Sequence, residues 1–497
     1  MSLQETVSTI VRSTMVPVLA VAVFVVSVFT GCATNEQATG NTAADPGVFT
    51  SQYKAKYDEY TAFLKQLCLE AKTKFDANPS ARGEFYMARC KYDQARLGAL
   101  MLKNGENPLA QSYPLLLLKA KAMQGCEDDM KKFDFMADAF ETELKLCAMM
   151  GEFEPVAIQA AAAAVAQYPA TDLTDANLEV LASLKKTQGA FKPFDIYISK
   201  YEDLAVRLTA AYDACKAELD AGKLPEKDMV RITLLLDKAH VGLQRLRDGL
   251  SPRPGLIEDF MAVAAYDYLY RQSQEDLQAG KTSYIQAFEL GTEKLKAEAA
   301  QLKDWRVTDV LKREIASFNL AFPRGPLSDD VIAKLVEIRA RRAPAGGSYD
   351  YEEKFKELTG NRIYLTGFCK AEYEAGRLAE EKFKENVWFW DLDRLTLAGL
   401  EHHGNPAYAK ALLTVKFNEY LLKNRETGKN VPAGELNNAK IKLFEAELDE
   451  IDKSNALSEG SLKSARRMLA DYPAEPLKDG RLKNLATPKK KGEVSEK

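Results

Sequence analysis

The sequence predicts an all-α protein made of stacked helical hairpins, and three features of its composition and pattern support this prediction. The 497 residues include only 28 Gly and 19 Pro, so the chain has few of the residues that a β-sandwich needs for its many turns. Charged residues make up 28% of the chain and are spread singly among apolar ones, a mixture that favours helices. Apolar residues also recur at steps of three and four, which is typical of helices with one buried face.

The clearest apolar stripe runs along residues 232–250 and predicts one long helix. Its members alternate steps of four and three: Ile232, Leu236, Ala239, Leu243, Leu246 and Leu250. Similar stripes predict further helices at about residues 53–75, 85–102, 131–150, 156–168, 257–277, 285–302, 331–338, 368–383, 407–422 and 439–451.

Three short connectors place a glycine where the C-terminus of a helix favours a left-handed residue. They are Asp220–Lys223, Gln278–Lys281 and Glu374–Arg377. The first two predict that the chain reverses, whereas the third lies inside a longer periodic stretch and is either a turn or a tolerated glycine. Ser328, followed by Asp329 and its acidic neighbour, has the pattern of a helix start.

The small-residue stretch of residues 343–348, Ala-Pro-Ala-Gly-Gly-Ser, predicts a domain boundary. We therefore expect a helical-repeat domain over residues 50–342 and a second helical domain over 349–488. A basic and polar tail, 489–497, follows.

An internal similarity supports a repeat architecture. Residues 165–186 and 469–490 align without gaps and share eleven of 22 residues, among them the Tyr-Pro pairs at 168–169 and 472–473. Because alanine, leucine and lysine are common residues, part of this similarity can arise by chance. We expect the two segments to be structurally equivalent.

Residues 140–169 resemble the tetratricopeptide helical repeat, in which two helices form a hairpin and successive hairpins stack. The residues that match its turn and second helix are Gly151, Phe153, Val156, Ala160 and Ala163. In the first helix Phe140 and Cys147 fit the pattern, whereas Glu143 stands where the family has an apolar residue and Pro169 comes one residue late. No regular 34-residue period covers the chain. The resemblance implies a binding scaffold.

The N-terminus resembles the lipobox signal of bacterial lipoproteins. An uncharged run follows Arg12, with an apolar centre from Met15 to Phe29, and ends in Phe-Thr-Gly before Cys32. The resemblance implies a signal peptide of residues 1–31, a covalent lipid on Cys32 and, over 32–49, a flexible tether to the membrane. The alternative is an uncleaved signal-anchor helix over residues 16–29. Ala33 favours the outer membrane over the inner one, with the body on its periplasmic or surface side.

The three histidines give little sign of a metal or catalytic site. His402 and His403 are adjacent, so on a helix they point about 100° apart, and no partner His follows at metal-ligand spacing. We interpret them as an exposed helix end, and His240 as a residue at the boundary of the buried stripe. The sequence also has no nucleophile motif, phosphate-binding glycine loop or paired-cysteine motif. We therefore expect no enzyme activity, no metal and no cofactor other than the lipid.

Six cysteines lie beyond Cys32, an even number in a compartment that permits disulfides. If Asn78-Pro79-Ser80 is the turn of a hairpin, Cys68 and Cys90 lie level on antiparallel helices and can form a disulfide. Cys126 and Cys147 instead bracket one helix, roughly 30 Å apart at 1.5 Å per residue, and cannot pair with each other. The alternative is that Cys68 and Cys90 are small buried thiols.

Two clusters are candidate binding residues. Trp388 and Trp390, next to two aspartates, are either a stacking platform for a sugar or peptide or core anchors at a helix junction. Arg339, Arg341 and Arg342 form a basic cluster, repeated more mildly at Lys489–Lys491. These cations either remain solvated or contact anionic lipid, glycan or an acidic partner surface.

These observations together favour recognition over catalysis. A net charge of −4 excludes a globally basic nucleic-acid binder. We expect a membrane-tethered scaffold or surface adhesin that binds a protein of the cell envelope or of a host surface. The alternatives are a solute-handling accessory lipoprotein of a transport system and, least favoured, an enzyme that acts on cell-wall polymer.

Overall fold

The computed structural model describes residues 46–108, 112–126, 133–184, 195–252, 255–302, 327–337, 351–427, 433–474 and 476–492. Regular structure in these ranges is helical, apart from one isolated bridge between Leu457 and Lys490. The prediction of an all-α array of hairpins is therefore confirmed. The signal peptide, Cys32 and the tether up to residue 45 lie outside the described residues.

The helices fall into three successive units that repeat one order of elements. The first unit comprises α3 (Pro46–Ala77), the short η1 (Pro79–Ala81), α4 (Arg82–Lys103), α5 (Tyr113–Gln124), α6 (Phe133–Met150), α7 (Pro155–Ala164) and α8 (Asp175–Ala182). The second comprises α9 (Asp195–Asp220), α10 (Glu226–Arg247), α11 (Leu256–Gln278), α12 (Tyr284–Leu302) and α14 (Asp329–Glu337). The third comprises α15 (Tyr351–Glu374), α16 (Glu380–Glu401), α17 (Ala407–Thr427), α18 (Ala433–Ser454), α19 (Glu459–Met468) and α20 (Asp479–Ala486).

The same helix contacts recur in each unit. The first two helices form a hairpin in α3–α4, α9–α10 and α15–α16, and the next two form another in α5–α6, α11–α12 and α17–α18. The last helix then packs back on the second one, as α8 on α4, α14 on α10 and α20 on α16. The described residues therefore repeat one helical motif three times, with six α-helices described in the first and third units and five in the second.

Glycines close three of the hairpins, as the connectors predict. Gly222, Gly280 and Gly376 have φ values of 68°, 70° and 70°, which only glycine adopts at no steric cost. The third connector is thus a turn: it divides the periodic stretch 368–383 between α15 and α16.

The predicted equivalence of the two Tyr-Pro segments is confirmed. Residues 165–182 and 469–486 begin directly after α7 and α19 and lead through a cis Tyr–Pro bond into α8 and α20. The described part of the second unit points to a third copy that sequence comparison missed, because the amide of Leu327 donates to Asp237 before α14 as that of Leu477 donates to Asp391 before α20. Residues 322–332, FPRGPLSDDVI, align with 168–178, YPATDLTDANL, and 472–482, YPAEPLKDGRL. The three share an aromatic-proline pair, a leucine five residues after the aromatic residue and an aspartate two residues later.

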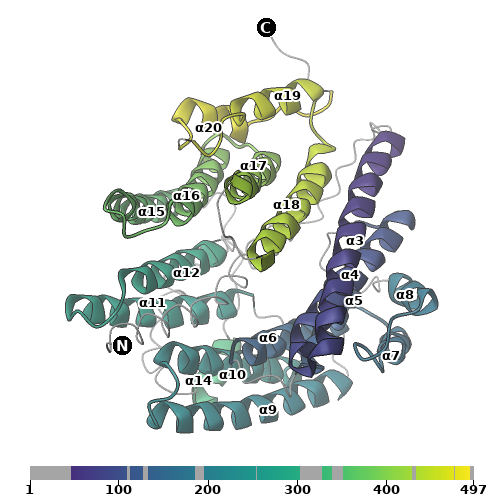
Figure 1. Cartoon of the computed structure of the whole chain (residues 1–497). Helices are drawn as coiled ribbons and strands as arrows, with labels where there is room; N and C mark the ends of the chain where they lie inside the picture. Colours follow the sequence, from purple (N-terminus) through teal and green to yellow (C-terminus); the bar gives the residue numbers. More distant parts are fainter. Residues whose placement is uncertain are drawn as a thin grey trace, which may run out of the picture.

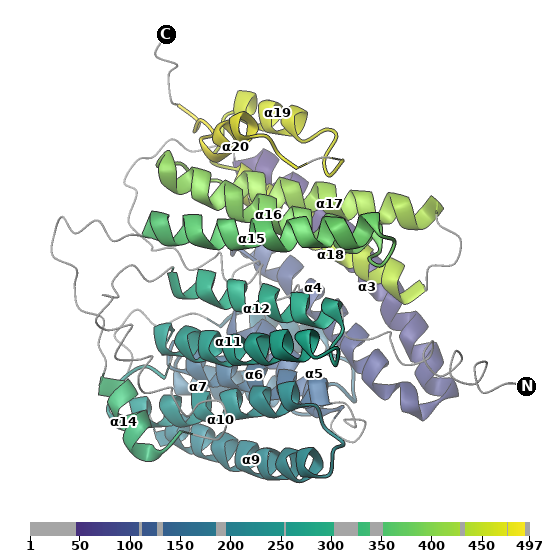
Figure 2. The same ribbon diagram turned by 90° about the vertical axis from the view of Figure 1, so that its left-hand side faces the viewer.

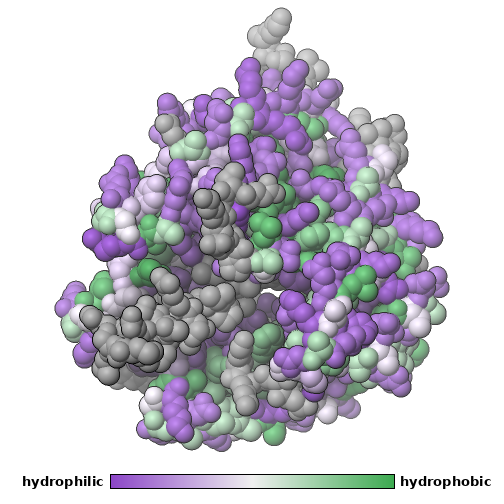
Figure 3. Space-filling view, in the orientation of Figure 1, coloured by the Kyte–Doolittle hydropathy of each residue, from purple (hydrophilic) through white to green (hydrophobic). Residues whose placement is uncertain are grey.

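The three units close into a ring. The fourth helix of each unit packs on the first helix of the next, as α6 on α9, α12 on α15 and, across the whole length of the chain, α18 on α3. Figure 1 shows the helices following one another around a central region, and Figure 2 shows α9 to α12, α15 and α16 stacked as near-parallel layers. The surface is hollowed near the middle of the ring in the space-filling view (Figure 3).

The closing contact between α18 and α3 is an extended one. Phe444 lies against Tyr60 and Phe63 with ring centroids 5.9 and 5.5 Å apart. Lys56 Nζ lies 2.5 Å from a carboxylate oxygen of Glu447. At the corresponding junction of α6 with α9, Phe140 and Glu143 contact Arg207. Phe140 and Glu143 lie 304 residues before Phe444 and Glu447, the same separation as the two Tyr-Pro pairs, so two of the three junctions use equivalent residues of the fourth helix.

The predicted domain boundary at residues 343–348 lies outside the described residues. The described part of the second unit ends at Glu337 and the third unit begins at Tyr351, on either side of that segment. The largest apolar core runs from α4 to α10 and so joins the first unit to the second.

Candidate functional site

An exposed apolar face on α15 is the first candidate site. It comprises Ile363, Tyr364, Gly367, Phe368 and Ala371, all exposed to solvent. Their spacing places them on neighbouring positions of one side of the helix. Tyr364 is 78% exposed and Phe368 is 45% exposed, although Phe368 also stacks on Tyr284 of α12, with ring centroids 3.7 Å apart. We call these five residues the α15 apolar face.

The equivalent positions of the other units show that this face is a property of the third unit alone. The first helices of the three units, α3, α9 and α15, can be aligned by their sequences. The alignment matches Tyr53 with Tyr197 and Tyr351, and it matches three buried aromatic residues, Tyr57, Tyr201 and Phe355. In this alignment the residues of α9 that correspond to Ile363, Tyr364 and Phe368 are Thr209, Ala210 and Ala214. In α3 the corresponding residues are Lys65, Gln66 and Glu70.

All nine of these residues are exposed. The position is therefore a solvent-facing one in the fold, and only the third unit fills it with large apolar side chains. The other two units fold with small or polar residues there, so the repeated fold does not require large apolar side chains at this position, although Phe368 also packs on Tyr284. An exposed apolar patch in a folded protein is typical of an interaction surface.

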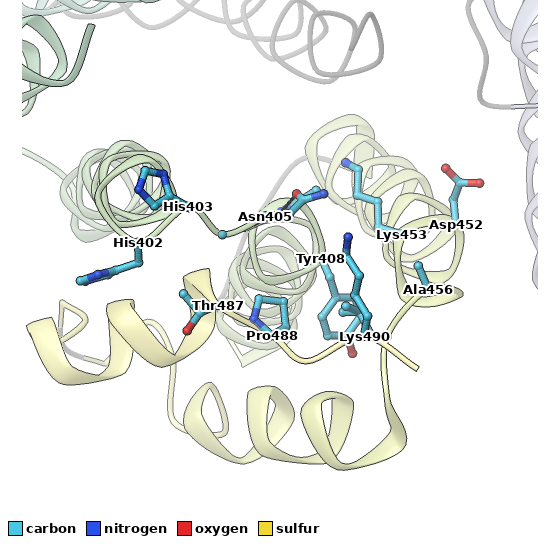
Figure 4. Close-up of a pocket in the computed structure, with 13 residues that line it drawn as sticks. His402, His403, Asn405, Tyr408, Asp452, Lys453, Ala456, Thr487, Pro488 and Lys490 are labelled. Atoms are coloured by element: carbon cyan, nitrogen blue, oxygen red, sulfur yellow. Dashed lines mark hydrogen bonds between the residues drawn. The ribbon is translucent and has the colours of Figure 1, made fainter. Parts of the chain in front are cut away.

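A cleft of about 600 Å³ at one end of the third unit is the second candidate site. It lies where α16 ends, α17 begins and the C-terminal segment passes α18 (Figure 4). His403, which follows the end of α16, has a φ of 50°, the one positive φ of a residue other than glycine in the described ranges. Strained backbone of this kind is concentrated at functional sites.

Gly404, the next residue, allows the end of α20 to lie close to the end of α16. A side chain on Gly404 would overlap the carbonyl oxygen of Ala486, so that only glycine fits between α16 and the end of α20. Asn405 then accepts a hydrogen bond from the amide of Ala407 (3.0 Å) and starts α17.

Backbone hydrogen bonds hold the C-terminal lysines at this cleft. The amide of Ser458 donates to the carbonyl of Lys489 (3.0 Å), and the amide of Lys491 donates to the carbonyl of Ala456 (3.2 Å). Lys490, between them, lines the cleft together with Lys453. Figure 4 shows these two lysines on one side and His402 and His403 on the other.

The cleft is therefore lined mainly by cationic and neutral polar groups. Its acidic lining residue, Asp452, accepts a hydrogen bond from Asn107 of the first unit (3.1 Å), and burial raises the pKa of its carboxyl. Tyr408 donates to Glu450 (2.9 Å), and burial raises its pKa above the ordinary value for a phenol. Lys453 is ion-paired with Asp449, and Lys490 is the other lining lysine whose charge an anionic ligand would meet.

The predicted aromatic residues are placed as packing residues. Trp388 is only 4% exposed and stacks on Phe417, with ring centroids 4.9 Å apart. Trp390 is partly buried, and the guanidinium of Arg394 lies 4.6 Å above its ring. Trp388 therefore has the position of a core anchor. Arg339, Arg341 and Arg342 lie outside the described residues.

Cys68 and Cys90 are both free thiols in the structure. Cys90 is buried, which raises its pKa to about 12, and the partly buried Cys68 also has a raised pKa for the same reason. The turn between their helices is the short helix η1, at the predicted Asn78-Pro79-Ser80.

The histidines lie as the sequence indicates. His402 and His403 are exposed at the end of α16, and His240 is partly buried on α10. Among the described residues no group of three histidine, cysteine or acidic side chains is arranged to hold a metal ion.

Comparisons with protein-family models, with curated proteins and with solved structures give no match for this chain. In the described ranges, no helix has both the length and the apolar character that a bilayer crossing requires.

Proposed function

We propose that this chain is a lipid-anchored protein of the bacterial cell envelope that works by recognition, and that the α15 apolar face is its contact surface for a protein partner. The main support for a contact surface on α15 comes from comparing it with α3 and α9. At positions that are exposed in all three helices, α15 alone has large apolar side chains. The lipid on Cys32 and the outer-membrane location rest on the lipobox resemblance.

The proposal has a plain energetic basis. Covering apolar surface stabilises a complex by roughly 25 cal/mol per Å² of area removed from water. Tyrosine is also enriched among the residues that dominate protein interfaces. Tyr364, at the centre of the face, is then the residue whose loss weakens binding most, and Phe368, held by Tyr284, presents a fixed edge beside it.

Capture from native membranes tests this function. The full-length chain, solubilised with its lipid, is expected to copurify with one protein in fixed stoichiometry. The double variant Tyr364→Glu/Phe368→Lys is expected to lose that protein, whereas Gln66→Glu/Glu70→Lys, the same residues introduced at the equivalent positions of α3, retains it. Equal recovery with both variants, or no stoichiometric partner for the unaltered chain, would refute the proposal.

The membrane anchor has a separate test. Intact-mass measurement of the mature chain is expected to show a start at residue 32 with added acyl mass. Cys32→Ser is expected to leave the signal peptide in place and to remove the acyl mass. A mature chain that begins at residue 1 and carries no lipid would exclude the anchor. The proposal that the α15 apolar face binds a protein would not be affected, because it does not depend on the lipid.

The cleft supports a second candidate function, the handling of a small anionic solute. Its volume of about 600 Å³ lies in the range of small-molecule sites, and Lys453 and Lys490 line it on one side. Calorimetric titration with inorganic phosphate and with short dicarboxylates tests this. Binding that Lys453→Ala/Lys490→Ala abolishes and Lys65→Ala/Lys72→Ala preserves would support it, and no heat with either probe would exclude those ligands.

A further inference from the structure

Each unit fastens its last helix to its second helix through a buried aspartate. In the first unit Asp93, on α4, is 2% exposed, and Arg96, one turn later, lies 2.8 Å from its carboxylate. The same guanidinium reaches Asp175 in the first turn of α8 (2.7 Å) and the carbonyl of Leu173 (3.1 Å). The arginine therefore neutralises the buried aspartate and holds the start of α8. We call this arrangement the corner clamp.

The third unit repeats the corner clamp. Asp391 is fully buried, and Arg394 lies 2.9 Å from it and 2.6 Å from Asp479 in the first turn of α20. The amide of Leu477 also donates to both oxygens of Asp391, at 3.2 Å each.

The second unit keeps both aspartates and loses the arginine. Asp237 is fully buried on α10 and accepts from the amide of Leu327 (3.0 Å), as Asp391 accepts from Leu477. Asp329 begins α14, in the place of Asp175 and Asp479. The residue one turn after Asp237 is His240, and the second oxygen of Asp237 has no hydrogen-bond partner.

We propose that the exchange of arginine for His240 makes the corner clamp of the second unit proton-sensitive, so that the attachment of α14 to α10 loosens when the pH rises. An arginine stays charged at every physiological pH, whereas a neutral histidine does not compensate the buried carboxylate. Among the described titratable groups, Tyr212 of α9 interacts electrostatically with Asp237. His240 follows one turn later on the same helix, and Asp329 of α14 acts on His240.

Burial of the Asp237 carboxyl sets the direction of the pH effect. Burial raises the pKa of Asp237 to about 8, an increase that the Leu327 amide only partly opposes. The folded chain therefore holds a proton that the unfolded chain, with an ordinary carboxyl pKa near 4, has already lost. The stability of this corner falls as the pH rises from about 4 to about 8.

The clamp of the third unit changes in a lower range of pH. The pKa of Asp391 is raised only to about 6, because the Leu477 amide and Arg394 oppose the effect of burial. Burial lowers the pKa of His240, with Asp329 opposing it. Protonation of His240 therefore weakens the corner only at acidic pH. The interval from pH 6 to pH 8 isolates Asp237.

Hydrogen exchange of the full chain, corrected for the intrinsic effect of pH, tests this proposal. Protection of α14 amides is expected to fall about tenfold or more between pH 6 and pH 8, since one pKa unit corresponds to a factor of ten. Protection of α8 and α20 in the same molecule is expected to change much less.

Two reciprocal variants sharpen the test. His240→Arg is expected to remove the loss of protection at α14, and Arg96→His is expected to create it at α8. If either variant fails to fold, Asp237→Asn, which keeps the shape and cannot ionise, is expected to make α14 insensitive to pH. Equal pH dependence in the three last helices of the unaltered chain, or an unchanged profile with Asp237→Asn, would overturn the proposal.

Discussion

The first and third units fasten their last helix with an arginine between two aspartates, whereas the second unit has a histidine in the same place. The difference is informative because the surrounding geometry is retained: the buried aspartate, the leucine amide that it binds in the second and third units, and the acidic first turn of the last helix. Three copies of one motif in one chain act as internal controls. A residue common to the copies serves the fold, and a residue that differs in a single copy is a candidate for function.

The largest effect is expected where a clamp arginine is removed. Arg394→Ala leaves Asp391 buried without its cation, and breaking a buried ion pair in this way costs about 3–5 kcal/mol in the free energy of unfolding. Chemical denaturation at pH 7 measures it. The matched control is Lys72→Ala, which breaks an exposed pair with Asp76 and is expected to cost less than about 1 kcal/mol. Equal effects of the two variants would show that the clamp is not a structural element.

A close helix contact gives the next largest effect. A side chain on Gly242 would overlap the ring of Tyr201, as one on Gly98 would overlap the equivalent Tyr57. Gly242→Ala is therefore expected to destabilise the chain by about 1–3 kcal/mol through overpacking. Gly434→Ala, at a helical position with open space, is expected to be neutral or to stabilise by up to about 1 kcal/mol. A stabilising Gly242→Ala would show that the first two helices of the unit lie further apart.

A junction between units gives a smaller effect. The hydroxyl of Tyr197 on α9 donates to the carbonyl of Met150 at the end of α6 (2.7 Å) in a buried setting. Tyr197→Phe removes this hydrogen bond and is expected to cost about 1 kcal/mol. Thermal unfolding at fixed pH measures this cost. A change smaller than the error of the measurement would show that the hydrogen bond does not stabilise the junction.

The reactivity of Cys68 and Cys90 distinguishes two free thiols from a disulfide between them, with no effect on stability expected. With both thiols free, an alkylating reagent modifies the partly exposed Cys68 in the native chain, whereas the buried Cys90, with a pKa of about 12, reacts only after unfolding. Peptide mass measurement reads the two sites. A Cys68–Cys90 disulfide would instead block both of them until a reductant is added.

Local features of the sequence predicted much of this fold. The glycines at 222, 280 and 376 allow the positive φ that ends a helix, and apolar periodicity marks the buried face of a helix. Both features are local, so the sequence alone predicts the turns and the helices. The third copy of the Tyr-Pro segment was missed because Phe322 and Ile332 replace a tyrosine and a leucine, and few identities remain. Ile332 is buried, as Leu178 and Leu482 are, so the fold needs apolar volume at that position rather than a leucine.

The candidate sites were harder to predict. The closing contact joins Tyr60 to Glu445, which are 385 residues apart, and no local pattern encodes such a pair. The α15 apolar face emerges only when Tyr364 is compared with Ala210 and Gln66, a comparison that requires the register of the three units. Large aromatic residues such as Trp388 suit both a binding platform and a core, and the sequence alone does not distinguish the two; in the structure Trp388 lies in the core.

A zero-length cross-link across the junction of α18 with α3 tests whether the three units close into a ring. Lys56 and Glu447 lie 2.5 Å apart across the junction of α18 with α3, and Lys74 and Glu84 lie 2.6 Å apart within the first hairpin. Treatment of the monomeric chain with a carbodiimide, followed by peptide mass analysis, is expected to yield both cross-links. A Lys74–Glu84 cross-link without any Lys56–Glu447 product would contradict the closed ring and indicate an open array.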